Sequence, residues 1–243
     1  MKVMKNLILL LPISLLVACG KSKPPMTIQE LNQNEVVTPD GSNIQGLYAA
    51  DLWPINFNLN FSRVGVAGIS RDGDNFEAMV KLKYGPKGIK HSQAIYTGRR
   101  CPTLQDDLNK DAYIDMQEAL MAIGRVTIPL DADLSSQKSG YGIFPIGNAN
   151  NGRYFYQETT SFEKMFSDLK NEDLDTEDQF EKIPENNGLT FPGRVILIQG
   201  ATEKGTLPET IAAPTGEGIR ESMPIACGIL WKVKSLPEDL KEE

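Results

Sequence analysis

Alternating apolar and polar residues in two segments constrain the fold of this chain more than any other feature. Residues 55–61 read Ile-Asn-Phe-Asn-Leu-Asn-Phe, and residues 76–84 read Phe-Glu-Ala-Met-Val-Lys-Leu-Lys-Tyr after a turn-forming run at 71–75. Successive side chains of a β-strand point to opposite faces, so both segments are predicted to be strands with one buried face. The three Asn residues of the first segment are then expected to face water.

The rest of the chain continues this pattern with short apolar segments between Gly and Pro residues. Further strands are predicted at 65–70, 92–97, 126–130, 141–146, 153–159, 194–199 and 225–233. Helices are predicted at 116–123, where good helix formers precede Gly124, and at 162–169, with Ser161 as the N-cap. Many short strands with one or two helical insertions favour a mainly β fold, an antiparallel β-sandwich.

The first nineteen residues have the composition of an export signal. A basic start precedes an apolar core from Leu7 to Val17, which is too short to span a bilayer. The segment Leu-Val-Ala-Cys19 looks like the bacterial lipoprotein box, in which the signal is cut before the Cys and the Cys is lipidated. An ordinary secretory signal with an incidental Cys is the alternative. Gly20 after the Cys indicates sorting to the outer membrane, so we expect a bacterial envelope protein anchored through lipid on Cys19.

Composition divides the remaining chain into three parts. Residues 20–45 carry few large apolar groups and are expected to form a flexible tether. Residues 46–234 are long enough for one domain with a sizeable core, and residues 235–243 form a charged tail. The net charge of −7 argues against a nucleic-acid partner. The expected partners are the membrane and an unidentified envelope component, and the oligomeric state stays open.

Two cysteines remain after Cys19. An exported domain with two cysteines most often pairs them, so Cys101 and Cys227 are predicted to form a disulfide. Closing a loop of this length is worth about 4–5 kcal/mol on the chain-entropy model. A nucleophilic cysteine is not expected, because His91 is the only histidine in the chain.

Residues 107–118 have the spacing of a calcium-binding loop of the EF-hand type. Oxygen-bearing side chains stand at loop positions 1, 3, 5, 9 and 12, with an apolar residue at position 8. The predicted ligands are the side chains of Asp107, Asn109, Asp111, Asp115 and Glu118 and the backbone carbonyl of Tyr113. A bidentate Glu at the last position favours calcium over Mg²⁺, which stays possible.

One loop position departs from this pattern. Position 6 is normally Gly because the turn there needs a positive φ, and here it is Ala112. A left-handed Ala costs about 1–2 kcal/mol, so a solvated acidic turn without an ion is the alternative. No second loop of equal quality exists to pair with this one. The acidic run at 171–178 has Lys182 where the last ligand should stand, and it is expected to be a solvated, mobile loop.

Three segments resemble strands of a known family. Residues 90–98, Lys-His-Ser-Gln-Ala-Ile-Tyr-Thr-Gly, resemble the His-Ile-His-x-Gly strand of chordin-type (CHRD) domains, which are related in fold to copper–zinc superoxide dismutases. Residues 193–200 resemble a later Gly-Arg strand that ends in His, and residues 224–230 resemble the Ala-Cys-Gly end of both families. The resemblance covers 46–234 and implies a Greek-key antiparallel β-sandwich whose cysteines stand where the dismutase disulfide does. It is strongest to CHRD-like bacterial lipoproteins with an EF-hand-like insertion, here at 101–124.

Departures from that family decide the expected chemistry. The two histidine positions of the first strand are Ala94 and Tyr96, and the later one is Gln199. A redox copper site needs several imidazoles, so no copper or zinc and no dismutase activity are expected. His91 is expected to be a packed or exposed strand residue rather than a ligand. The sequence also has no Gly-x-Ser-x-Gly elbow and no Walker-type glycine loop.

The combined prediction is a calcium-binding, lipid-anchored envelope protein that is not an enzyme and has a structural or binding role. Two alternatives stay open. One is a calcium-dependent adhesion or ligand-binding module, in which the ion shapes a loop that grips a partner. The other is a metal-dependent hydrolase, which would need an open metal site facing a deep cleft.

Overall fold

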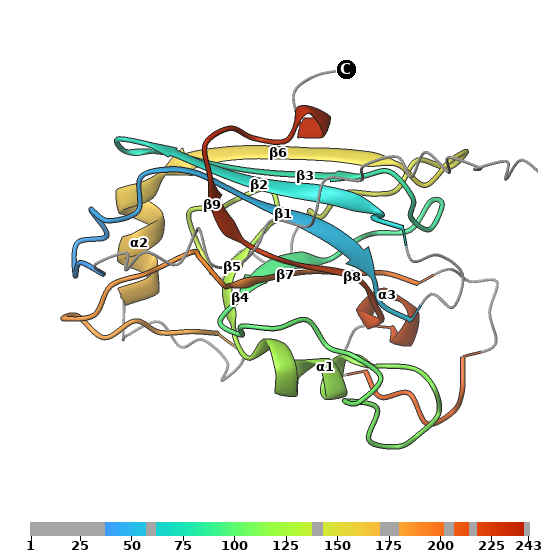
Figure 1. Ribbon diagram of the computed structural model, residues 1–243. Coiled ribbons are helices and arrows are strands. Elements are labelled where there is room, and N and C mark those ends of the chain that lie inside the picture. The colour runs from blue at the N-terminus through green and yellow to red at the C-terminus, as the bar shows by residue number, and fades with distance from the viewer. Residues whose placement is uncertain are drawn as a thin grey trace, which may run out of the picture. The chain divides into compact units, whose positions relative to one another are not determined.

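The computed structural model of this chain has, in its described residues, nine strands in one curved antiparallel sheet (Figure 1). The structure describes residues 37–56, 62–137, 143–170, 180–201, 207–213 and 218–240. The strands are β1 (Gly46–Pro54), β2 (Gly65–Asp72), β3 (Asn75–Leu82), β4 (Gln93–Tyr96), β5 (Val126–Pro129), β6 (Tyr154–Ser161), β7 (Val195–Gln199), β8 (Pro224–Ile229) and β9 (Trp231–Val233). The helices are α1 (Met116–Ile123), α2 (Phe162–Lys170), α3 (Ile219–Ser222) and a 3-10 helix at Glu238–Leu240. Within these ranges no helix has the length and apolar character needed to cross a membrane.

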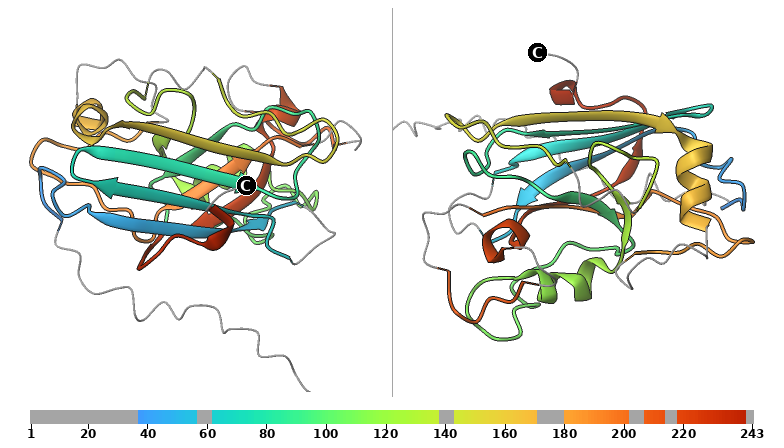
Figure 2. Two further views of the ribbon diagram at one scale, coloured as in Figure 1. Left: turned by 90° about the horizontal axis from the view of Figure 1, so that it is seen from above. Right: turned by 180° about the vertical axis from the view of Figure 1, so that it is seen from behind.

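The sheet folds over into two layers (Figure 1, Figure 2). The strand order is β5-β4-β7-β8-β1-β2-β3-β6, and β9 also pairs with β1. β1 joins the layers, because it pairs with β2 along its length and with β8 at its end, where Trp53 lies opposite Cys227. β7 returns to lie beside β4, as the fourth strand of a Greek key does. The predicted mainly β antiparallel sandwich is therefore confirmed.

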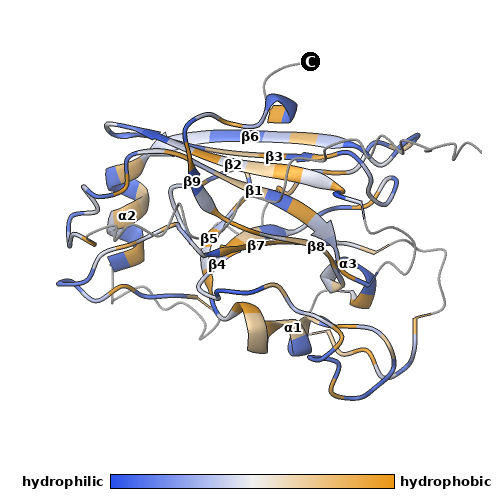
Figure 3. Ribbon diagram, in the orientation of Figure 1, coloured by the Kyte–Doolittle hydropathy of each residue, from blue (hydrophilic) through white to orange (hydrophobic). Residues whose placement is uncertain are grey.

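Apolar side chains from both layers meet between them. β3 presents its alternate residues from Phe76 to Leu82 to this core, each at most 1% exposed, as the alternation of the sequence predicts. Phe191 contacts Tyr48 and Phe76, with ring centroids 5.4 and 5.7 Å away. Figure 3 shows the same division, with apolar residues along β7 and β8 and many polar residues in the connecting loops.

Both predicted helices form. α2 follows β6 directly, and the Ser161 hydroxyl accepts a hydrogen bond from the Lys164 N–H at 3.2 Å, as expected of an N-cap. The apolar face of α2 lies against one end of the sandwich (Figure 2). α1 covers the predicted residues and ends at Gly124, which has a φ of 73°. Helix formers and capping residues act locally, which is why the sequence predicts these two elements well.

The alternating segment 55–61 does not form the predicted strand where it is described. β1, which lacks such alternation, ends at Pro54, and Asn56 has a left-handed backbone with a φ of 60°. The Asn56 amide does not simply face water, because it bonds to the backbone of Ile114 and Pro224. These tertiary contacts override the local pattern, and residues 57–61 lie outside the described residues.

Two other predicted strands also differ from the structure. Of the predicted strand 141–146, only residues 143–146 are described, and among these only Ile146 pairs, in an isolated bridge with Lys90. The predicted strand 225–233 is two strands separated by Leu230. β8 pairs with β7, whereas β9 pairs with β1. The chain therefore changes its hydrogen-bonded neighbour strand at Leu230.

On each side of the predicted domain, 46–234, an apolar side chain is buried. Ile44, in the segment predicted to be a tether, is fully buried and belongs to the core cluster of the sandwich. In the predicted tail 235–243, Leu240 is 5% exposed and packs on the outer face of β2 and β3. The signal with Cys19, the rest of the tether up to residue 36 and the acidic run 171–178 lie outside the described residues.

Candidate functional site

The predicted calcium loop, residues 107–118, lies on the outer side of the layer that contains β4, β7 and β8 (Figure 1). Cys101 and Cys227 form the predicted disulfide, with Cα atoms 5.8 Å apart, and so attach the start of the insertion to β8. α1 leaves the other end of the loop and packs Ala119 and Ile123 onto the same layer. The loop is therefore held at both ends on one face of the sandwich.

The first half of the loop wraps around its own polar side chains. The Asp107 carboxylate accepts hydrogen bonds from the N–H groups of Asp111 and Ala112, at 3.2 and 2.9 Å. Asn109 Oδ1 accepts from the Asp111 N–H, and Asp111 accepts from the Tyr113 N–H, both at 2.9 Å. Ala112 has a φ of 68°, so it takes the left-handed turn that usually requires Gly. The backbone thus adopts the turn that the ligand spacing demands, despite the side chain at position 6.

The second half of the loop is closed by a capping box at the start of α1. The Asp115 carboxylate accepts from the Glu118 N–H at 2.9 Å, and Glu118 Oε2 accepts from the Asp115 N–H at 3.1 Å. Glu118 Oε1 also accepts from the Leu108 N–H at 2.7 Å. Glu118 is only 5% exposed. The last predicted ligand is therefore folded back beside the first turn of the loop.

The loop carboxylates bond to loop amides rather than to one another. Among the described residues, no three His, Cys, Asp or Glu side chains converge as a ready-made metal site. A carboxylate has about four lone-pair positions, so an oxygen that accepts one N–H bond keeps capacity for a cation. Partial burial opposes ionisation of Asp111, but hydrogen bonds from Thr210 and the Tyr113 backbone hold its pKa below the usual value. Asp111 is therefore ionised at neutral pH, and a carboxylate suits a hard cation.

A distant segment, residues 207–213, contacts the loop from outside. The Thr210 hydroxyl donates to Asp111 Oδ2 at 2.5 Å, and the Ala212 N–H donates to Asp115 Oδ2 at 2.8 Å. Neither contact was predicted, because Thr210 lies 99 residues from Asp111 and nothing in its neighbourhood marks it. The site is therefore larger than the twelve-residue motif and includes side chains that the motif does not reveal.

The positions at which the resemblance would place copper ligands are filled by apolar packing. Ala94 and Tyr96 on β4 are 6% and 3% exposed and belong to a cluster with Met116 and Ile123 of α1. Gln199 Nε2 donates to the Met116 sulfur at 3.0 Å. The insertion therefore covers this part of the sandwich with hydrocarbon, and the residues present do not fit a copper centre.

His91 is a packed residue in the interior. It is fully buried, its ring stacks on Tyr154 with centroids 5.2 Å apart, and Nδ1 lies 2.8 Å from the Gln199 carbonyl oxygen. Burial lowers the pKa of His91, so the ring is neutral at neutral pH. Of the two expectations for this residue, packing and surface exposure, the structure has packing.

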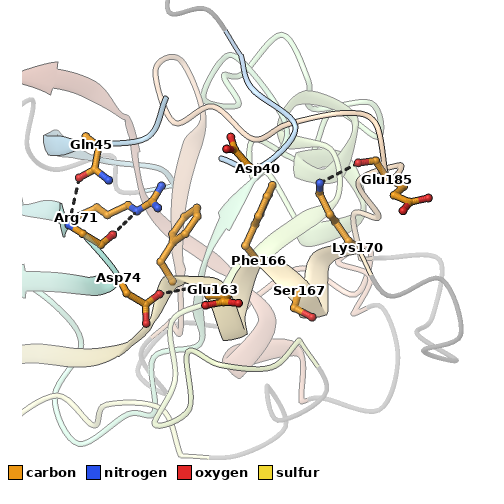
Figure 4. A pocket seen from close by; sticks show the side chains of 11 residues that line it. Asp40, Gln45, Arg71, Asp74, Glu163, Phe166, Ser167, Lys170 and Glu185 are labelled. Carbon is orange, nitrogen blue, oxygen red and sulfur yellow. Dashed lines mark hydrogen bonds between the residues drawn. The ribbon is translucent and has the colours of Figure 1, made fainter. Parts of the chain in front are cut away.

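A groove lies at the α2 end of the sandwich (Figure 4). The Arg71 guanidinium stacks over Phe162 at 3.3 Å and donates to the Ile44 carbonyl at 2.7 Å. Lys170 donates to the Glu185 carbonyl at 2.9 Å, so both cations of the groove are engaged by the protein itself. The residues that line it include no His, no Cys and none of the six predicted calcium ligands. The groove is therefore separate from the predicted calcium loop.

Comparison with known proteins gives similarity in structure alone. No family model matches the sequence, and no curated protein matches it. Among solved structures, a mutant of an SOD-like protein from Bacillus subtilis is similar at 15% identity and a TM-score of 0.37, over 74% of this chain and 95% of that chain. The Cu/Zn superoxide dismutase from Brucella abortus is similar at 13% identity and a TM-score of 0.36, over 75% of this chain and 98% of that chain. At such low identity and TM-score the likeness says nothing about activity or ligands.

Proposed function

We propose that this protein is a calcium-binding, lipid-anchored component of the bacterial envelope with a structural or binding role and no enzymatic activity. The observation that carries the proposal is the loop at residues 107–118. Six oxygen donors stand at the required spacing, the backbone at Ala112 already has the positive φ that the turn needs, and Glu118 folds back toward the first turn. The apolar filling around Ala94 and Tyr96 supports the absence of copper chemistry.

Calcium would act by neutralising the acidic side chains of the loop. Asp107, Asp111, Asp115 and Glu118 repel one another when they are ionised and close together, and a divalent cation among them removes that repulsion. Because the disulfide and α1 attach the loop to the sandwich, an ordered loop stabilises the whole domain by the free energy of binding. The ion would therefore serve the fold and the surface that the loop presents.

Calorimetric titration of purified, tag-free protein with calcium chloride tests this proposal. We expect one calcium ion per chain, with a dissociation constant of about 10⁻⁴–10⁻³ M or somewhat tighter, as in other extracellular calcium loops. Magnesium should bind more weakly, because it dehydrates reluctantly and prefers a rigid octahedral shell. A titration in which no heat of calcium binding is detected would contradict the proposal.

Lipid attachment is tested separately by Cys19→Ser. Cells that express the unmodified chain and are fed labelled palmitate should incorporate the label into the protein and retain it in the outer membrane fraction, because several acyl chains at one site anchor stably. The Cys19→Ser chain should lose both the label and the membrane association, whereas Cys101→Ser should keep both. Label that persists after Cys19→Ser would contradict anchoring at this residue.

A further inference from the structure

The side chain of Asn56 is bonded to the predicted calcium loop although it lies far away in the sequence. Asn56 follows β1 and is half-buried. Its Oδ1 accepts from the Ile114 N–H at 2.6 Å, and its Nδ2 donates to the Ile114 carbonyl at 2.6 Å and to the Pro224 carbonyl at 3.1 Å. One amide therefore bonds both polar backbone groups of Ile114 and the first residue of β8.

Ile114 stands at position 8 of the loop, between two predicted ligands. Its side chain is 2% exposed and packs in the cluster beneath α1. A residue in an antiparallel sheet exchanges both its N–H and its C=O with the residue opposite when the two form a hydrogen-bonded pair. Asn56 makes the same two bonds with a single side chain. It thus bonds the backbone of the loop as a neighbouring strand would.

Because the peptide unit is planar, these two bonds set the directions of the Tyr113 carbonyl and of the Asp115 N–H, which contacts Glu118. In a trans peptide the C=O and the following N–H point in opposite directions. The Ile114 N–H faces Asn56, so the carbonyl of Tyr113, which shares its peptide plane, faces away from Asn56. The Ile114 carbonyl also faces Asn56, so the Asp115 N–H faces the opposite way, where it donates to Glu118 Oε2 at 3.1 Å.

We propose that Asn56 is a positioning residue for calcium, which holds the backbone of Ile114 and so aims the Tyr113 carbonyl and the Glu118 carboxylate at the ion. This inference rests on the proposed calcium binding at 107–118. Partners outside the coordination shell that orient ligands typically contribute about 10–100-fold to metal affinity. The bond from Asn56 to Pro224 also links the loop to β8, so calcium binding and the stability of the sandwich are coupled through this residue.

Two variants separate positioning from a general structural role. Asn56→Gly keeps the left-handed backbone, because Gly adopts a positive φ without strain, and removes all three amide bonds. Asn43→Gly is the matched control. Asn43 is also half-buried, and its amide also makes three bonds, accepting from the N–H and hydroxyl of Thr38 and donating to the Leu189 carbonyl. None of these three bonds reaches residues 107–118.

Calcium titration of the full-length variants below their melting temperatures is the deciding experiment. Asn56→Gly is expected to raise the calcium dissociation constant by about tenfold or more, and Asn43→Gly is expected to leave it unchanged. Asn56→Asp keeps an acceptor for the Ile114 N–H but turns a carboxylate oxygen toward the Ile114 and Pro224 carbonyls, so it should also weaken calcium binding. It also serves as the second variant if Asn56→Gly does not fold.

The lifetime of terbium luminescence, excited through tyrosine, would not change if Asn56 only stabilised the fold. With terbium in place of calcium, Asn56→Gly should shorten the luminescence lifetime in water, because a water molecule replaces the Tyr113 carbonyl. A normal dissociation constant and lifetime in Asn56→Gly would overturn the positioning role while leaving the calcium site intact. If the unmodified protein itself binds neither ion, the proposed function fails and the positioning role fails with it.

Discussion

Reduction of the Cys101–Cys227 disulfide is expected to lower the free energy of unfolding by about 4–5 kcal/mol, the chain-entropy value for a closed loop of this size. The two cysteines are 126 residues apart in the sequence, so the bond restricts most of the unfolded domain. Such a loss is a large fraction of the stability of a typical domain. Urea unfolding of the oxidised and the reduced protein, both with Cys19→Ser, measures the difference without altering a core residue.

A variant that lacks both cysteines is the control for chemical reduction. Cys227 is 1% exposed in the cluster under α1, so substitution by Ser would add the cost of burying a hydroxyl. Cys101→Ala/Cys227→Ala avoids that polar group and should unfold at the same urea concentration as the reduced protein. Coincident unfolding curves for the oxidised and reduced forms would contradict a stabilising bridge.

The sequence predicts the elements that are encoded locally. α1 and α2 follow from helix formers and capping residues, and β3 follows from alternation with one face in the core. β1 is not recognisable in this way, because Tyr48, Ala49 and Ala50 are all buried in a strand that joins both layers. A strand covered on both faces does not alternate. Asn56 shows the reverse, since it belongs to an alternating segment but has a left-handed backbone and bonds to Ile114 of the predicted calcium loop.

The candidate site divides in the same way. The ligand spacing at 107–118 is a local property and can be read directly, and Cys101 and Cys227 can be paired because no other cysteine remains in the domain. Asn56 and Thr210 could not be found, since they lie 58 and 99 residues from their partners and are ordinary surface residue types. Alternation even predicts that Asn56 faces water. Contacts of this kind depend on the packed fold and leave no periodic signal in the sequence.

Calcium is expected to raise the melting temperature by about 5–10 °C when its concentration is about one hundred times the dissociation constant. At that ratio binding adds about 2.7 kcal/mol to the free energy of unfolding, and in a domain of this size each kcal/mol corresponds to about 2–4 °C. Glu118→Gln should abolish this rise, because it removes the charge and the bidentate clamp at position 12. Thermal melts in excess EDTA and in calcium at one hundred times the measured dissociation constant test both expectations.

The variants are chosen to separate the effect of calcium binding from the effect of the capping box at the start of α1. Gln at the third helical position can still accept the Asp115 N–H bond of the capping box, but its amide nitrogen then faces the Leu108 N–H, so the melting temperature in EDTA should fall. The calcium response is therefore measured for each variant as the difference between its melts in calcium and in EDTA. Asp106→Asn is the neighbouring control. The Arg100 guanidinium, bonded to both carboxylate oxygens of Asp106, lowers the pKa of that group to about 2 and engages it outside the loop. This variant should keep the full calcium response, whereas Asp107→Asn should lose it. Equal responses at positions 106 and 107 would show that calcium acts through general surface charge and not through a site.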